Sequence, residues 1–237
     1  MIRAVLFDLD DTLCDDTGQM FESIREVAGL VPGGDPEAIA QGYWRISHRF
    51  WTYEIHTRPP EPLESIRELL WQQTLGEAGV THSPAQIKLL AARYGEAREK
   101  TPPPFPDAEH TLIQLKARGL KLGIVTNGVS ESHTGKLARL GLGHFFDTVL
   151  MPDQTGFAKP DPRQFHLACQ RLGVNPEHTA HIGDSLVSDV GGARSAGLTA
   201  IWYNPANKSR PETASEPHHT VQTLAELLGL FDPRAEG

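Results

Sequence analysis

The sequence predicts an α/β fold, a doubly wound parallel sheet whose chain is interrupted by an inserted, all-helical segment. Three observations support this prediction. Several short runs are apolar on both faces, helical patterns that stop before a glycine lie between them, and a long stretch ahead of residue 100 has helical patterns without a clear strand.

The apolar runs are expected to be the strands of the sheet. Runs that are apolar on both faces are typical of parallel strands covered by helices on either side. The five expected strands are Ile2–Phe7, Lys121–Thr126, Thr148–Met151, Thr179–Ile182 and Thr199–Trp202.

The segments that separate the later strands are expected to be helices. A glycine follows each of them, which is the usual signal at the carboxyl end of a helix. These helices are Ala108–Arg118, Ser130–Leu140, Arg163–Leu172 and Leu186–Ala196.

The inserted segment follows the first strand and contains four helical patterns. A proline-rich stretch, Thr101–Pro106, comes after it and is expected to be a stiff, extended linker. We therefore expect an α/β core domain made of residues 1–16 and 101–237 and a helical domain made of residues 17–100. The four expected helices are Met20–Ala28, Pro36–Ile55, Leu63–Ala78 and Pro84–Glu99.

Composition narrows the class of protein. The 237 residues carry a net charge of −8 without a block of basic residues, which disfavours a nucleic-acid partner. Two cysteines are too few for a disulfide scaffold and favour a reducing compartment. Asp8 comes too early for a signal peptide, and no apolar run reaches the length of a membrane span. A cytoplasmic protein without a membrane partner is expected, and its oligomeric state is not predicted.

The first candidate site is the acidic segment Asp8–Leu13, which directly follows the first strand. Ligands of open α/β sheets bind at the carboxyl ends of the strands. Asp8 and Asp10 are two residues apart and would point the same way in an extended segment, where they repel unless a cation or a shared proton intervenes. An acidic turn of purely structural role is the alternative. A calcium loop is excluded because Leu13 and Gln19 stand where glycine and glutamate are required.

A second acidic pair follows the strand Thr179–Ile182. Asp184 is a candidate ligand of Mg²⁺, an ion that takes few carboxylates and completes its shell with water and phosphate. Asp189 lies in the first turn of the next expected helix, where an acid also complements the helix dipole.

Two further motifs can bind a phosphate. Thr126 and Asn127 end a strand before a helix, where a hydroxyl and backbone N–H groups can hold a phosphate oxygen, although an ordinary helix cap is the alternative. Lys159 can neutralise a phosphate and a carboxylate nucleophile, although a single lysine is more often a surface charge.

The four motifs, in this order, resemble those of the haloacid dehalogenase (HAD) superfamily. The resemblance covers nearly the whole chain and implies a Rossmann-like HAD core with an inserted C1-type helical cap domain. Gly191–Ala193 and Trp202–Asn204 add a weaker similarity to nucleotidases and N-acylneuraminate-9-phosphatases within the superfamily.

The resemblance also implies a role for each matched residue. Asp8 would be the nucleophile, and Asp10 would be the general acid and then the general base. Asp8, the carbonyl group of Asp10 and Asp184 would bind Mg²⁺, with Asp189 acting behind them or through water. The residues expected to hold the phosphoryl group are Thr126, Asn127 and Lys159.

The expected function is therefore Mg²⁺-dependent hydrolysis of a small phosphorylated metabolite, a nucleotide or sugar phosphate, through an aspartyl-phosphate. As the general acid, Asp10 must hold a proton near neutral pH, so we expect its surroundings to raise its pKa. The dehalogenases of the superfamily lack an acid at the position of Asp10, which disfavours a 2-haloacid dehalogenase. A phosphomutase, or a non-catalytic binding protein with the HAD fold, would also be consistent with the four motifs.

The inserted helices contain one stripe that could contact a substrate. Aromatic and cationic side chains at helical spacing can bind a base or sugar, but they more often form the packed face of a helix. The stripe consists of Trp44, His48, Trp51 and Ile55, with Arg45 and Arg49 beside it.

Overall fold

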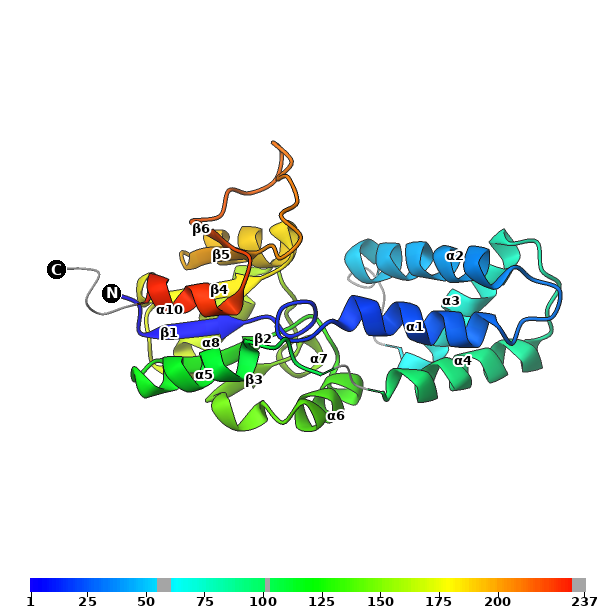
Figure 1. Cartoon of the computed structure of the whole chain (residues 1–237), viewed down its shortest axis with the longest axis horizontal. Helices are drawn as coiled ribbons and strands as arrows, with labels where there is room; N and C mark the ends of the chain where they lie inside the picture. Colours follow the sequence, from blue (N-terminus) through cyan, green and yellow to red (C-terminus); the bar gives the residue numbers. More distant parts are fainter. Residues whose placement is uncertain (55–60, 101–102, 232–237) are drawn as a thin grey trace. The chain divides into compact units, whose positions relative to one another are not determined.

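The computed structural model describes residues 1–54, 61–100 and 103–231. The chain divides into two compact units. One comprises Met1–Asp15 and Pro102–Gly237, and the other comprises Asp16–Thr101. The first unit is α/β and the second is helical in the residues described (Figure 1).

The α/β unit is built on a parallel sheet of six strands in the order β3-β2-β1-β4-β5-β6. The five predicted strands are confirmed. The sixth was not predicted because it is short and two of its three residues are exposed. The strands are β1 (Ala4–Phe7), β2 (Lys121–Val125), β3 (Thr148–Leu150), β4 (Thr179–Gly183), β5 (Thr199–Tyr203) and β6 (His219–Val221).

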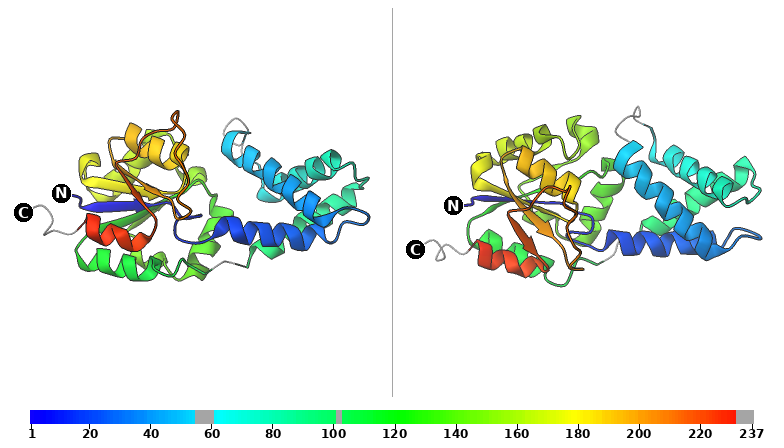
Figure 2. Two further views of the ribbon diagram at one scale, coloured as in Figure 1. Left: turned by 45° about the horizontal axis from the view of Figure 1, so that its top comes forward. Right: turned by 90° about the horizontal axis from the view of Figure 1, so that it is seen from above.

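Helices cover both faces of this sheet, as Figure 2 shows. Successive strand side chains point to opposite faces, so Val5 and Phe7 belong to one hydrophobic cluster while Ala4 and Leu6 belong to another. The first cluster includes side chains of α5 (Ala108–Ala117), α6 (Ser130–Leu140) and α10 (Leu227–Leu230). The second includes side chains of α8 (Pro162–Leu172) and α9 (Gly192–Ser195). Both faces are therefore buried, which explains the uniformly apolar strands.

Local sequence signals fix the ends of α8. Asp161 caps its first turn by accepting a hydrogen bond from the backbone N–H of Arg163 at 2.9 Å, and Pro162 occupies the first helical position. Gly173 ends the helix with a φ of 62°, a left-handed conformation that suits glycine.

The predicted helix Leu186–Ala196 differs from the observed structure. It is a π-helical turn over Leu186–Gly191 followed by the short α9. The carbonyl oxygen of Ser185 accepts from the backbone N–H groups of both Asp189 and Val190, at 3.1 Å each, and the second of these bonds widens the turn by one residue.

The helical unit has its own core. Its elements are α1 (Asp16–Ala28), α2 (Pro36–Arg49), the π-helical turn Phe50–Glu54, α3 (Leu63–Glu77) and α4 (Pro84–Arg98). The rings of Tyr43, Trp71 and Tyr94 pack together at its centre. Asp16 accepts two hydrogen bonds from Arg98, at 2.7 and 2.8 Å, and this ion pair joins the two ends of the unit.

The aromatic stripe, which runs from α2 into the π-helical turn, is largely used in packing. Trp44 and Trp51 are partly buried against the helical core. The Trp44 ring also stacks against Phe21, at 5.5 Å between centroids, and against His48, at 5.3 Å. The fourth predicted member of the stripe, Ile55, lies outside the described residues.

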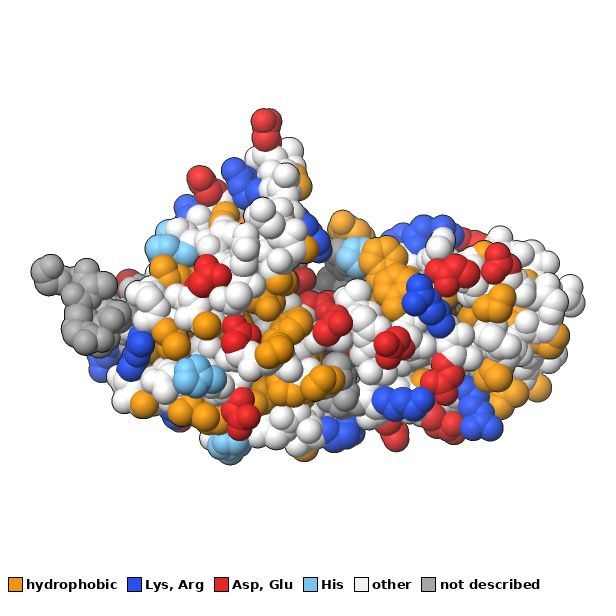
Figure 3. All heavy atoms as spheres, in the orientation of Figure 1, with side chains coloured by type: hydrophobic (Ala, Val, Ile, Leu, Met, Phe, Trp, Pro, Cys, Tyr) orange, Lys and Arg blue, Asp and Glu red, His pale blue; other side chains and the backbone are white. Residues whose placement is uncertain are grey.

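The two arginines beside the stripe form exposed ion pairs. Arg45 donates to Glu77 at 2.7 Å, and Arg49 donates to Glu54 at 2.8 Å. Exposed pairs of this kind contribute little to stability. On the face drawn in Figure 3, acidic and basic side chains are interspersed over each unit. Among the described helices, none is both long enough and apolar enough to cross a membrane.

Candidate active site

The site lies where three neighbouring strands of the α/β unit end. Phe7 of β1 is in register with Ile124 of β2 and with Ile182 of β4. The polar segments that follow these strands therefore emerge side by side at one edge of the sheet. They contribute Asp8 after β1, Thr126 and Asn127 after β2, and Asp184 after β4.

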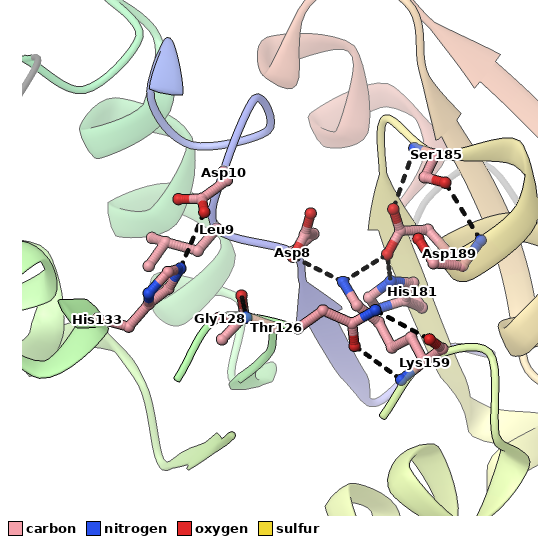
Figure 4. A network of polar contacts seen from close by, with 12 residues as sticks. Asp8, Leu9, Asp10, Thr126, Gly128, His133, Lys159, His181, Ser185 and Asp189 are labelled. Atoms are coloured by element: carbon pink, nitrogen blue, oxygen red, sulfur yellow. Dashed lines mark hydrogen bonds and ion pairs between the residues drawn. The ribbon is translucent and has the colours of Figure 1, made fainter. Parts of the chain in front are cut away.

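Lys159 links two carboxylates at the centre of the site. Its Nζ donates to Asp8 Oδ1 at 2.6 Å and to Asp189 Oδ1 at 2.7 Å, as Figure 4 shows. Its side chain is only 2% exposed. Burial alone would lower the pKa of this ammonium group, but the two carboxylates raise it above its usual value, so Lys159 stays charged.

Asp189 is the best-supported carboxylate of the site. Its Oδ1 contacts Lys159 and also lies 2.9 Å from Nε2 of His181. Its Oδ2 accepts from the backbone N–H of Ser185 at 3.0 Å. Burial alone would raise the pKa of Asp189, but Lys159 and His181 hold it well below the usual value. A side chain at position 183 would overlap the Asp189 carboxylate, which explains Gly183.

Three carboxylates of the site could hold a metal ion. Oxygen atoms of Asp8, Asp184 and Asp189 lie within 4.8 Å of one another. Burial, together with the charge of Asp189, raises the pKa of Asp8 to about 7 against the opposing effect of Lys159. Burial and the neighbouring carboxylates also raise the pKa of Asp184 well above its usual value. A divalent cation would relieve this repulsion, and an all-oxygen set of few carboxylates fits Mg²⁺.

Asn127 and Thr126 are positioned by local hydrogen bonds. The Asn127 amide donates from Nδ2 to the carbonyl oxygen of Lys159 at 2.9 Å, and its Oδ1 accepts from the Lys159 backbone N–H at 2.8 Å. Thr126 Oγ1 accepts from the backbone N–H of Gly128 at 3.1 Å. Asn127 is thus joined to the centre of the site through Lys159, and the Thr126 hydroxyl is fixed at the end of β2.

The carboxyl group of Asp10 faces α6. Its Oδ2 lies 2.9 Å from Nε2 of His133, and its Oδ1 accepts from Nζ of Lys136 at 2.7 Å. Burial alone would raise the pKa of Asp10, but His133 and Lys136 hold it well below the usual value. The expectation that the surroundings of Asp10 raise its pKa is therefore wrong, because two hydrogen-bonding partners on a later helix were not anticipated.

The sequence did contain a signal for these partners. The buried face of α6 includes His133, Lys136, Leu137 and Leu140, which follow the spacing of a core-facing helical stripe. Polar residues at core-facing positions indicate a buried partner. His181, whose pKa is lowered by burial despite Asp189, was missed because it stands inside an otherwise apolar strand.

The sequence and the fold are both similar to those of known proteins. Residues 2–197 match the family described as haloacid dehalogenase-like hydrolase. The chain is 38% identical over 249 residues to the phosphoserine phosphatase of Thermus thermophilus, covering 96% of this chain and 98% of that protein. It is 34% identical over 207 residues to the glyceraldehyde 3-phosphate phosphatase of Methanothermobacter thermautotrophicus, covering 86% of each.

A solved structure is also similar along almost the whole chain. It is that of YfnB from Bacillus subtilis, a HAD hydrolase crystallised with magnesium bound. The TM-score is 0.80 at 26% identity, and the match covers 98% of this chain and 99% of that one.

Proposed function

The chain belongs to the haloacid dehalogenase-like hydrolase family, and we propose that it is a Mg²⁺-dependent phosphatase of small phosphorylated metabolites. The arrangement of Asp8 is the main support. This carboxylate lies at a strand end beside the buried Lys159 and close to two further carboxylates. The two relatives named as phosphatases support phosphate as the group transferred.

In the proposed reaction, Asp8 attacks the phosphorus atom of a phosphate monoester. The bond from phosphorus to the leaving oxygen breaks, and the phosphoryl group is then carried by Asp8. Lys159 neutralises the negative charges that would otherwise keep Asp8 and the phosphate apart. Thr126 would donate its hydroxyl hydrogen to a phosphoryl oxygen, and Asn127 would act by holding Lys159 in place.

The residues that would hold Mg²⁺ are Asp8, Asp184 and the carbonyl group of Asp10. When bound, the ion neutralises charge on the reacting phosphate. Asp189 is better suited to support the site than to bind the ion, because its two oxygens already accept from donors on three residues, Lys159, His181 and Ser185.

Asp10 would transfer protons in both halves of the reaction. It donates a proton to the leaving oxygen and later takes one from the water that attacks the phosphorus atom, which regenerates Asp8. The carboxylate form that His133 and Lys136 favour is the form the second half needs. A bound phosphate dianion adds negative charge beside Asp10, which favours its protonation before the first half.

The presence of Asp10 also favours phosphate over halide chemistry. A halide leaves without a proton, so a dehalogenase has no use for an acid at this position. For the helical unit we propose a role in selecting the substrate, since the residues assigned above address only the phosphoryl group.

The test is a screen of the purified protein against phosphorylated metabolites, including O-phosphoserine and glyceraldehyde 3-phosphate, with p-nitrophenyl phosphate as a general substrate. Activity should disappear with EDTA and return with Mg²⁺. Rapid acid quenching during turnover should trap a phosphoryl group on the peptide that contains Asp8. Turnover that survives metal removal, or a phosphoryl group on another residue, would contradict the proposal.

A further inference from the structure

Two side chains of α6 engage both oxygens of Asp10. His133 lies on Oδ2 and Lys136 on Oδ1, and the two residues are three apart on one face of the helix. Their side chains are 8% and 7% exposed, whereas the Asp10 side chain is 29% exposed. The two partners are therefore buried behind a carboxyl group that itself remains accessible.

The surrounding structure is built to place the His133 ring there. Ser132 Oγ lies 2.9 Å from the other ring nitrogen, Nδ1, and donates its own hydrogen to the carbonyl oxygen of Val129 at 3.2 Å. A side chain at position 128 would overlap the imidazole, so Gly128 is required for the ring to reach Asp10. Burying the Lys136 ammonium group is costly unless an anion accompanies it.

We propose that His133 and Lys136 are positioning residues that fix the Asp10 carboxyl group for proton transfer at the leaving oxygen. This inference rests on the proposed function, in which Asp10 is the acid. A carboxyl group on an aspartate rotates about two side-chain bonds. Partners on both oxygens fix its plane, and a misplaced acid transfers a proton poorly to an atom whose position is set by the phosphate.

This role has a consequence that a merely structural role lacks. Proton donation matters most when the leaving oxygen is strongly basic and hardly at all when it is a good leaving group. Loss of His133 or Lys136 should therefore harm substrates with poor leaving groups selectively. General loss of the site would instead reduce the hydrolysis of all substrates in parallel.

The experiment uses substituted phenyl phosphates that have similar shape but different leaving-group basicity. The measured quantity is the ratio of kcat/KM for p-nitrophenyl phosphate to that for p-methoxyphenyl phosphate. The variants are His133→Ala, His133→Gln, Lys136→Met and Asp10→Asn, and the double variant that combines Asp10→Asn with His133→Ala. His110→Ala, an exposed histidine of α5, is the matched control, and the thermal midpoint of each variant checks folding.

We expect the ratio to rise by about 10-fold or more in Asp10→Asn, His133→Ala and Lys136→Met. His133→Gln keeps an N–H donor and should restore much of the wild-type ratio. His133→Ala should change nothing further once Asp10 is replaced, because coupled residues are not additive. His110→Ala should keep the wild-type ratio.

Different results would contradict the role of Asp10 and the role of its two partners. An unchanged ratio in Asp10→Asn would contradict the acid role of Asp10 in the proposed reaction. A raised ratio in Asp10→Asn with an unchanged or lowered ratio in folded His133→Ala and Lys136→Met would overturn only the positioning role.

Discussion

The side chain of Asn127 and the peptide groups of Lys159 exchange two hydrogen bonds, at 2.8 and 2.9 Å. Both ends of the Asn127 amide are therefore engaged with the backbone of the residue whose ammonium group lies between Asp8 and Asp189. This relationship joins the segment after β2 to the segment that precedes α8, and it supports the proposal that Asn127 holds Lys159 in place.

The first prediction concerns Asn127→Ala. Loss of the two hydrogen bonds frees the backbone of Lys159, so we expect kcat/KM to fall by about 10-fold or more while the protein stays folded. Steady-state kinetics with p-nitrophenyl phosphate would measure this. Asn204 makes the same reciprocal pair with Lys208, at 2.9 Å each way, and is not one of the residues assigned to the reaction. Asn204→Ala is thus the control, and equal losses in both variants would contradict a specific role for Asn127.

The second prediction concerns Asp8→Asn. The amide has the same shape but no nucleophilic carboxylate, so turnover should fall by roughly 10⁴-fold or more.

The same variant tests the effect of Asp8 on stability. The pKa of Asp8 is raised to about 7, mainly by burial, so ionising this group destabilises the metal-free fold progressively as pH rises toward 7. At pH 8 the metal-free variant should therefore unfold no earlier than wild type. Calorimetry of both proteins without Mg²⁺ would test this, and a clearly lower midpoint for Asp8→Asn would contradict the argument.

The strands and the motif positions could be predicted because they depend on local sequence. An apolar run such as that of β1 specifies a buried strand, and Asp8 then lies at the end of that strand whatever the rest of the fold does. The ends of α6 and α8 were predictable for the same reason, since Gly141 and Gly173 mark them directly.

The environment of Asp10 could not be predicted in this way. His133 is 123 residues away along the chain, and its contact with Asp10 depends on how α6 packs against the sheet. The pKa of Asp10 is therefore lowered, whereas the sequence led us to expect a raised pKa. Asn127 is a second case, because its bonds to Lys159 follow from the meeting of two loops and not from either loop alone.

The third prediction concerns the pH dependence of Mg²⁺ binding. With its pKa raised to about 7, Asp8 holds a proton in much of the metal-free protein below pH 7 and loses it above. Mg²⁺ must displace that proton, so its affinity should fall as pH is lowered from 8 to 6, and binding should release protons. Isothermal titration calorimetry in buffers of different ionisation enthalpy measures both effects. The affinity of Asp8→Asn should depend less on pH, and an equal dependence would assign the proton to another group.

The fourth prediction separates the roles of Asp184 and Asp189. Asp184→Ala removes a proposed ligand and relieves its repulsion with Asp189 and Asp8, since these neighbours help to raise the pKa of Asp184 well above its usual value. We expect this variant to need much more Mg²⁺ for half-maximal activity, by roughly 100-fold, while the metal-free protein unfolds no earlier than wild type.

Asp189→Ala should instead lower the stability of the protein. It leaves the buried Lys159 and His181 without the carboxylate between them and removes the acceptor of the Ser185 N–H, so it breaks a buried charge network. Breaking a buried pair from one side costs about 3–5 kcal/mol, which should appear as a large drop in the thermal midpoint with or without Mg²⁺. Asp189→Asn keeps an acceptor for the Ser185 N–H and should lose less stability. Titrating activity against Mg²⁺ at a temperature where all variants are folded completes the comparison. A larger Mg²⁺ requirement for Asp189→Asn than for Asp184→Ala would make Asp189 the direct ligand and overturn the assignment of Asp184.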